Sequence, residues 1–251
     1  MKRQKPPEND SFGPEEFAAA TGAPRETVDR LIIYADLLRK WNQRINIVSP
    51  ASIDSMWRRH FLDSAQLLKI AEKVLANRAD GRSYCWADFG SGGGFPALVL
   101  AIMVGNGPDR GRPPTPGGSQ DNVSRETFGQ NIEPGSFDFH LVESDARKVA
   151  FLREAARLTD TNVTIHNCRI ENLEPFPVDL TSARALAPLP KMLDLLSGFI
   201  GKETTCLFPK GQDVDIELTN AAKCWNMEVH KVQSLTDEAG TILMLRNVIR
   251  R

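Results

Sequence analysis

The stretch Asp88-Phe89-Gly90-Ser91-Gly92-Gly93-Gly94-Phe95-Pro96 decides how this chain of 251 residues folds. It follows an apolar run, residues 84–87, that is typical of a short buried strand. It precedes the apolar residues 97–104, which are typical of a buried helix. In α/β folds, a strand, a glycine turn and a helix in this order bring backbone N–H groups close to a nucleotide or nucleoside. The stretch therefore predicts a ligand-binding turn in a mostly parallel sheet.

The spacing of the glycines narrows the kind of ligand. Gly90, Gly92 and Gly94 give the pattern acidic-x-G-x-G-x-G. A dinucleotide fingerprint requires its third glycine where Phe95 stands, and a phosphate loop requires a Gly-Lys-Ser/Thr ending that this stretch lacks. The run resembles the S-adenosylmethionine (SAM) turn of class I methyltransferases, where a Cβ at a crowded glycine would intrude on the ligand. On this motif alone, an ordinary glycine-rich turn between a strand and a helix is the alternative.

Composition is typical of a soluble globular protein. Hydrophobic residues make up 41% of the chain and charged residues 25%, and neither a bilayer-spanning apolar run nor a secretory signal pattern is evident, so we expect a cytoplasmic protein. The net charge is −1 and the pI is about 6.4, so any nucleic-acid surface must be a local patch. The cysteines form no C-x-x-C pair, which predicts reduced thiols and no metal site; they are Cys85, Cys168, Cys206 and Cys224.

Three regions are expected along the chain. Residues 1–23 begin with a charged, proline-rich stretch and are predicted to be a disordered tail. Residues 24–80 show helical periodicity and no strand-like alternation, which predicts a helical cap. Residues 81–251 are predicted to be the SAM-binding methyltransferase domain. Helices of the cap are expected at 24–43, about 53–61 and 62–78.

From residue 84 onward, strand and helix patterns alternate, which predicts a mostly parallel sheet with helices on both faces. Only a short turn around residues 237–240 separates the last two strands, so the final strand is expected to run antiparallel to its predecessor. Strands are expected at 84–89, 138–143, 162–167, 178–183, 204–208, 226–232 and 241–248, and helices at 96–104, 145–158, 189–198 and 213–224.

Residues 105–136 interrupt this alternation. They contain seven glycines and five prolines among 32 residues, which predicts a flexible insertion. A nucleoside-binding unit places an acidic residue about 20 positions after its glycine turn. Glu143 follows Gly94 by 49 positions, or by 17 once the insertion is set aside. Glu143 is therefore the candidate ligand for the cofactor's ribose hydroxyls, with capping of helix 145–158 as the alternative.

Candidate site residues follow the third, fourth and fifth expected strands, at the edge where parallel sheets bind ligands. Ile170 and Glu171 are candidates for contacts with adenine, with a solvated loop as the alternative. Arg184 should meet a ligand or a carboxylate because an unpaired buried arginine is costly, and a structural salt bridge is the competing interpretation. Lys210 is a candidate for contact with an RNA phosphate or the target base, although a lone loop lysine is more often solvated.

The cap contributes a polar cluster on the helix expected at 53–64. Arg59 and Asp63 are spaced as i,i+4 partners, and His60 stands one step round the helix. We expect these groups to line the floor of the cofactor pocket; an ion pair and a helix-end histidine are the plainer alternative. His60, Asp63 and Lys210 are the candidate catalytic residues.

Several segments in a fixed order carry a family resemblance in addition to the glycine turn. They are K-W-N-Q-R-I-N from Lys40, R-H-F-L-D-S from Arg59, L-V-E-S-D-A-R-K-V-A-F-L-R from Leu141, S-A-R-A-L-A-P-L from Ser182 and P-K-G-Q from Pro209. From about residue 37 to residue 248, the chain resembles the bacterial 16S ribosomal RNA guanine-N7 methyltransferase family, RsmG/GidB. The insertion at 105–136 is longer than the family needs.

This resemblance implies a class I, Rossmann-like methyltransferase fold with a seven-stranded sheet. It also implies SAM as the cofactor, 16S ribosomal RNA or the small ribosomal subunit as the partner, and a monomer. SAM contacts are implied at Gly90, Phe95, Ile170, Glu171 and Arg184.

Guanine N7 chemistry suits a sequence without an evident catalytic base. N7 has an in-plane lone pair and no proton, so methyl transfer requires alignment and exclusion of water more than proton removal. A splayed or loop guanine is expected, because a stacked base cannot enter a closed pocket. Two other classes stay open: a SAM-dependent enzyme acting on a small metabolite, and a non-catalytic SAM- or RNA-binding regulator. A solvated helix face is the alternative for each of the residues expected to hold phosphates, which are Arg58, Arg59, Arg147, Lys148, Arg153 and Arg157.

Overall fold

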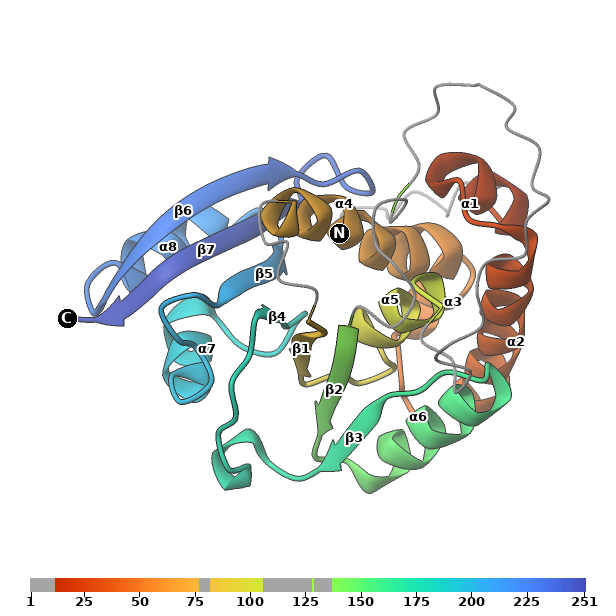
Figure 1. Cartoon of the computed structure of the whole chain (residues 1–251). Helices are drawn as coiled ribbons and strands as arrows, with labels where there is room; N and C mark the ends of the chain where they lie inside the picture. Colours follow the sequence, from red (N-terminus) through yellow and green to blue (C-terminus); the bar gives the residue numbers. More distant parts are fainter. Residues whose placement is uncertain (1–11, 77–81, 106–127, 129–136) are drawn as a thin grey trace, which may run out of the picture.

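The computed structural model describes residues 12–76, 82–105, 128 and 137–251. Its centre is a seven-stranded sheet with the order β3-β2-β1-β4-β5-β7-β6 (Figure 1). The first five strands along the chain pair in parallel, and β7 pairs antiparallel with both β5 and β6, which confirms the predicted sheet. The strands are β1 (Tyr84–Phe89), β2 (Phe137–Glu143), β3 (Thr164–Asn167), β4 (Leu180–Ser182), β5 (Thr205–Lys210), β6 (Trp225–Gln233) and β7 (Thr241–Arg250).

Alternating side chains of the central strands pack into two cores, one on each face of the sheet. On β1, Trp86 belongs to the first core, whereas Ala87 and Phe89 belong to the second. Helices α5 (Ala97–Met103) and α6 (Ala146–Leu158) contribute to the first core. Helices α7 (Leu189–Leu196) and α8 (Val214–Ala221) cover the second. The prediction of helices on both faces is confirmed.

The cap packs onto the first core. Residues of its helices share one continuous hydrophobic cluster with β1, β2 and α5, so cap and sheet are stabilised together. The cap helices are α1 (Pro14–Thr21), α2 (Arg25–Asn42), α3 (Pro50–Ile53), the π-helix η1 (Trp57–Leu62) and α4 (Asp63–Leu75). Figure 1 shows α2 lying next to α6 and α4 crossing toward the β7 side of the sheet.

The predicted disordered tail over residues 1–23 is wrong from Phe12 onward, because helix α1 occupies part of that range. Phe17 of this helix is fully buried, and its ring lies 5.6 Å from that of Trp57. Pro14 in the first turn and Gly22 in the left-handed conformation bound the helix at its two ends. Residues 1–11 lie outside the described residues.

The predicted flexible insertion, residues 105–136, falls almost entirely outside the described residues. Phe128 is described, and it is only 8% exposed. Its backbone N–H donates to the Thr21 carbonyl at 2.8 Å, and the Lys69 ammonium lies 5.4 Å from its ring centre. One residue of the segment is therefore packed against the cap. No helix within the described ranges is long and apolar enough to cross a membrane.

Candidate functional site

The glycine turn is held rigidly over the end of β2. The backbone N–H groups of Gly90 and Ser91 both donate to the Val142 carbonyl, at 2.9 and 3.1 Å. Gly90, Gly92 and Gly94 all have positive φ, at 72°, 57° and 89°, a region that side-chain-bearing L-residues rarely adopt. The spacing seen in the sequence thus meets a backbone requirement at each of the three positions.

Space around the turn distinguishes Gly92 from Gly94. A Cβ on Gly94 would lie 2.8 Å from both Tyr34 Oη and Leu98 Cβ, so this glycine permits the cap to pack on the turn. A Cβ on Gly92 would meet nothing closer than the Gly90 carbonyl oxygen at 3.7 Å. The open side at Gly92 is where a ligand can approach the backbone. The structure therefore explains Gly94 by packing, and the cofactor contact predicted for it stays a prediction.

Two buried carboxylates flank the turn. Glu143, at the end of β2, is 8% exposed, and it accepts the N–H groups of Gly92 at 2.9 Å and Asp145 at 2.7 Å. Asp145 is the N-cap of α6, so the contact of Glu143 with the start of this helix, expected as the alternative to ribose binding, is present. The remaining lone pairs of the Glu143 carboxylate are available to a ribose.

The second carboxylate is Asp88, which is fully buried. Its Oδ1 accepts the Ser182 hydroxyl at 2.7 Å, and its Oδ2 has no hydrogen-bond partner among the described residues. Burial raises the pKa of Asp88 to about 6, a rise that hydrogen bonds from Ser182 and Ser91 oppose. Asp88 is the acidic residue that begins the glycine motif, and the sequence pattern alone predicts no separate role for it.

A cavity of about 1010 Å³ opens beside the turn. Its walls come from the cap, the glycine turn, the residues after β4, the end of β5, the segment that joins β6 to β7, the start of β7, and one residue each of α6 and α8. Predicted site residues that line it are Gly90, Gly92, Phe95, His60, Asp63, Arg184 and Lys210. Four other predicted residues, Gly94, Glu143, Ile170 and Glu171, are not among its lining residues.

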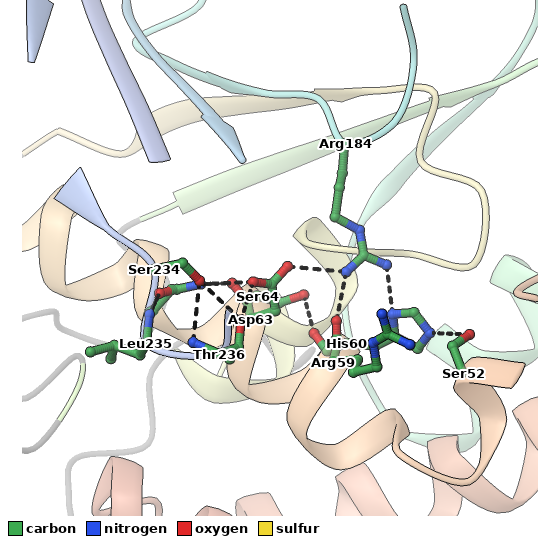
Figure 2. Close-up of polar contacts among 10 residues, drawn as sticks. Ser52, Arg59, His60, Asp63, Ser64, Arg184, Ser234, Leu235 and Thr236 are labelled. Atoms are coloured by element: carbon green, nitrogen blue, oxygen red, sulfur yellow. Dashed lines mark hydrogen bonds and ion pairs between the residues drawn. The ribbon is translucent and has the colours of Figure 1, made fainter. Parts of the chain in front are cut away.

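Arg184 connects the sheet to the cap through three acceptors, as Figure 2 shows. Its Nη1 donates to the Arg59 carbonyl at 3.0 Å and to Asp63 Oδ2 at 3.2 Å. Its Nη2 donates to His60 Nδ1 at 2.8 Å, and the guanidinium carbon lies 5.2 Å from the centre of the Phe95 ring. The carboxylate partner anticipated for Arg184 is therefore present, on the wall of the cavity.

The expected i,i+4 pair of Arg59 and Asp63 is replaced by this arrangement. Residues 57–62 form a π-helix, whose wider turn removes the α-helical alignment on which the i,i+4 expectation rests. Asp63 is turned toward Arg184 instead. π-Helical turns are found frequently at functional sites.

His60 has a defined tautomer. Because a guanidinium only donates, His60 Nδ1 must accept from Arg184, so Nε2 carries the proton and donates to Ser52 Oγ at 3.0 Å. Burial, and then the positive charges of Arg184 and Arg59, lower the pKa of His60 to about 3. His60 is thus neutral near pH 7, and its ring stacks on Phe95 at 4.9 Å. A neutral, weakly basic imidazole orients Arg184 and is a poor proton acceptor.

Lys210 is the last residue of β5, and the expectation of a lone loop lysine is wrong. Its side chain is only 10% exposed. The ammonium donates to Glu217 Oε2 at 2.8 Å and to the Ala187 carbonyl at 3.1 Å. Glu217 also accepts the Leu189 N–H at 2.6 Å, so Lys210 joins the ends of β5, α7 and α8.

Ile170 and Glu171 begin a short 3₁₀ turn, η2 (Ile170–Asn172), after β3. Ile170 is buried in the second core, and Glu171 is exposed. The exposed Glu171 side chain is accessible to a ligand, whereas the Ile170 side chain packs against other apolar residues of the second core.

The cysteines differ more than the sequence suggested. Cys206 is buried, Cys85 and Cys168 are half-buried, and Cys224 is exposed, so the interpretation of core thiols does not extend to Cys224. All four are free. The described residues hold no cluster of three or more histidine, cysteine, aspartate and glutamate side chains that fits a metal ion.

Comparisons with known proteins agree with the sequence resemblance. The family model for GidB, "rRNA small subunit methyltransferase G", matches residues 27–106 and 131–244. The ribosomal RNA small subunit methyltransferase G of Paramagnetospirillum magneticum is 44% identical over 239 residues, which cover 95% of this chain and 98% of the relative. The protein of the same name from Rhodospirillum centenum is 41% identical, over 96% of this chain and 94% of the relative.

A solved structure shares the fold. It is a putative class I S-adenosylmethionine-dependent methyltransferase from Listeria monocytogenes, with a TM-score of 0.53 and 13% identity over 96% of this chain and 70% of that chain. At this identity the likeness concerns the fold alone, and it confirms the predicted fold class. With a family model that matches most of its length and relatives at 41–44% identity, the chain belongs to the GidB family, rRNA small subunit methyltransferase G.

Proposed function

We propose that this protein transfers a methyl group from SAM to N7 of a guanine in 16S ribosomal RNA. One observation carries the proposal: a single cavity joins the glycine turn to walls formed by the cap, by the residues after β4 and β5, and by the residues between β6 and β7. Such a cavity has room for a methyl donor and an acceptor base together. The names of the relatives, ribosomal RNA small subunit methyltransferase G, supply the class of substrate.

The residues at the turn fit SAM. Gly92 leaves its Cβ side open, so a ligand can approach the backbone there. Asp88 is fully buried and is not among the residues that line the cavity, so it supports the start of the turn through its hydrogen bond from Ser182. Glu143 offers carboxylate lone pairs beside the turn, which suit a ribose diol. When bound, SAM supplies an electrophilic methyl group on its sulfonium sulfur.

The protonation states of the cavity residues suit an acceptor atom that carries no proton. His60 is neutral, and its Nδ1 lone pair is occupied by Arg184. Lys210 is committed to an ion pair with Glu217. Neither group is placed to remove a proton, and guanine N7 has none to remove. The residues therefore act by holding the base in line with the methyl group and by excluding water.

A guanine must leave its stack to enter this cavity, so an unpaired or splayed nucleotide is the expected substrate. Arg59 and Lys148 line the cavity and can meet backbone phosphates at its mouth. Arg147 and Arg157 form exposed ion pairs within α6 and are weaker candidates. We infer a monomer that acts in the cytoplasm on 16S ribosomal RNA or the small subunit.

Chemical cleavage of cellular RNA tests the proposal. N7 methylation leaves guanine cationic, so its imidazole ring opens readily and the RNA chain can be cleaved at that position. Ribosomal RNA from cells that lack this protein should lose one cleavage stop in the small-subunit RNA, and purified enzyme with SAM should restore it. A stop that persists without the protein would refute the proposal, as would methyl label on adenine N6 or on a small metabolite alone.

A further inference from the structure

The segment between β6 and β7 forms one wall of the cavity. Its lining residues are Ser234, Thr236, Asp237 and Gly240. The glycine turn follows β1, and β4 and β5 separate β1 from β7 in the sheet. The segment 234–240, here named the hairpin loop, therefore lies at the end of the cavity remote from the cofactor turn. In the proposed reaction, this end of the cavity is left for the acceptor base when SAM occupies the turn.

The buried side-chain amide of Gln66 links the hairpin loop to the cap by hydrogen bonds. Gln66, on α4, is only 3% exposed. Its Oε1 accepts the backbone N–H of Leu235 at 2.8 Å, and its Nε2 lies 3.4 Å from Ser234 Oγ. The same Nε2 donates to Asp63 Oδ1 at 2.9 Å. Because both ends of a buried amide are hydrogen-bonded, displacing the loop would leave polar groups unsatisfied.

Asp63 contacts both Gln66 and Arg184, and Figure 2 shows its contact with Arg184. Asp63 Oδ1 accepts the Thr236 hydroxyl at 2.7 Å, and Oδ2 accepts Arg184 Nη1 at 3.2 Å. One carboxylate thus fixes the arginine after β4 and the hairpin loop at the same time. The position of the loop is set relative to the residues that face the cofactor turn.

We propose that Gln66 and Thr236 are positioning residues that hold the hairpin loop as the wall against which the target guanine nucleotide is seated. This inference rests on the proposed methyl transfer to RNA. Methyl transfer requires the acceptor atom in line with the methyl group, and a misplacement of about 1 Å can reduce the rate about 100-fold. Loosening the wall should therefore impair use of the RNA and leave the binding of SAM intact.

Two substitutions with matched controls test this inference. Gln66→Leu removes the amide, and Thr236→Val removes the hydroxyl while keeping the shape of the side chain. Thr236→Ser retains the hydroxyl, and Lys73→Ala changes an exposed residue of the same helix α4. The measurements are kcat/KM for RNA methylation, the Kd of SAM by calorimetry, and hydrogen exchange of the Leu235 amide.

Gln66→Leu should lower kcat/KM for RNA at least tenfold, remove the protection of the Leu235 amide, and change the Kd of SAM by less than twofold. Thr236→Val should lower kcat/KM severalfold, and Thr236→Ser should stay within twofold of the parent, as should Lys73→Ala. If Gln66→Leu does not fold, the Thr236 pair decides alone.

Three outcomes would overturn the inference: retained Leu235 protection in Gln66→Leu, an unchanged kcat/KM once that protection is lost, or a Kd for SAM that rises in step with the loss of activity. A parent enzyme that methylates no RNA would instead refute the proposed function, and this inference with it.

Discussion

The two ends of the cavity are built in opposite ways. At the cofactor end, one contiguous stretch, residues 88–95, provides the turn, and its shape depends on backbone conformation at three glycines. Toward the hairpin loop, Arg184, Asp63 and Thr236 come from segments up to 173 residues apart. They form a shared side-chain network that reaches back to the turn where Arg184 lies against Phe95. A backbone site is therefore encoded locally, whereas a side-chain network exists only after the chain has folded.

Because of this difference, we expect substitutions in the turn and substitutions in the network to have different kinds of effect. A substitution in the turn acts through steric contact and backbone strain at one position. A substitution in the network leaves former partners unsatisfied on other elements, so effects at neighbouring positions are not additive.

Gly94 and Gly92 should separate stability from binding within the turn. Gly94→Ala places a Cβ 2.8 Å from Tyr34 Oη and Leu98 Cβ at a positive φ, which is expected to lower the free energy of unfolding by about 3 kcal/mol. Gly92→Ala meets open space, so it should cost about 1 kcal/mol from its positive φ. It should also weaken SAM binding at least tenfold. Denaturant unfolding and calorimetry measure these quantities; equal destabilisation with unchanged SAM affinity would contradict the distinction.

Asp88 should make the free energy of unfolding depend on pH. Its folded pKa of about 6 exceeds the unfolded value of about 3.9. A carboxyl with a raised folded pKa stabilises the fold below the unfolded pKa and loses that contribution as pH rises through the folded pKa. The free energy of unfolding should therefore fall by about 3 kcal/mol between about pH 3 and pH 7 through this group.

The Asp88→Asn variant lacks this titration, so its stability relative to the parent should rise over the same range and then level off. His60 acts in the opposite direction, because its folded pKa of about 3 makes stability fall as pH drops below about 6.5. Comparing parent and variant at each pH removes this common contribution. A stability difference that does not vary between pH 4 and pH 7 would contradict the buried, unpartnered state of Asp88.

Arg184 tests whether the network serves the ligand or only the fold. Arg184→Ala should weaken SAM binding or methyl transfer at least tenfold, which corresponds to about 1.4 kcal/mol. Arg184→Lys should restore little, because an ammonium cannot reproduce the planar fork that meets Asp63, His60 and the Arg59 carbonyl. If thermal stability drops while turnover per folded molecule is unchanged, Arg184 is a structural salt bridge.

The smallest effect is expected for residues 106–127, which lie outside the described part of the chain. Replacing residues 106–127 by a short Gly/Ser linker, with Phe128 retained, should leave the melting temperature and SAM affinity unchanged. Loop closure depends only weakly on length, and this segment is rich in glycine and proline. Thermal unfolding followed by circular dichroism measures the outcome. A loss of cooperative unfolding would show that more of the segment than Phe128 supports the cap.

Local patterns predicted the fold because they recur along the chain. Apolar periodicity placed α2 at 24–43, against Arg25–Asn42 in the structure, and the short turn before residue 241 predicted the antiparallel last strand. Sequence order alone did not place β7 between β5 and β6, since strand order depends on which edges pair after the chain folds. Helix α1 was missed although Pro14 and Gly22 were signals for its ends.

The candidate site was predicted in part. The glycine turn and the position of Glu143 beside it could be predicted because the spacing of a nucleoside-binding unit is nearly fixed; the role of Glu143 in ribose binding stays a prediction. The network could not be found, because the π-helix at 57–62 breaks the α-helical alignment on which the pairing of Arg59 with Asp63 was based. Gln66 gave no signal at all, since a glutamine on an amphipathic helix is ordinarily an exposed polar residue.

The identity of the methylated atom tests the central claim most directly. Purified protein is incubated with SAM labelled in its methyl group and with 16S ribosomal RNA or small subunits from cells that lack the protein; the RNA is digested to nucleosides and analysed by mass spectrometry. We expect the label to appear in 7-methylguanosine, at about one methyl group per RNA molecule. Label on any other nucleoside, or no label in RNA from a protein that binds SAM, would contradict it.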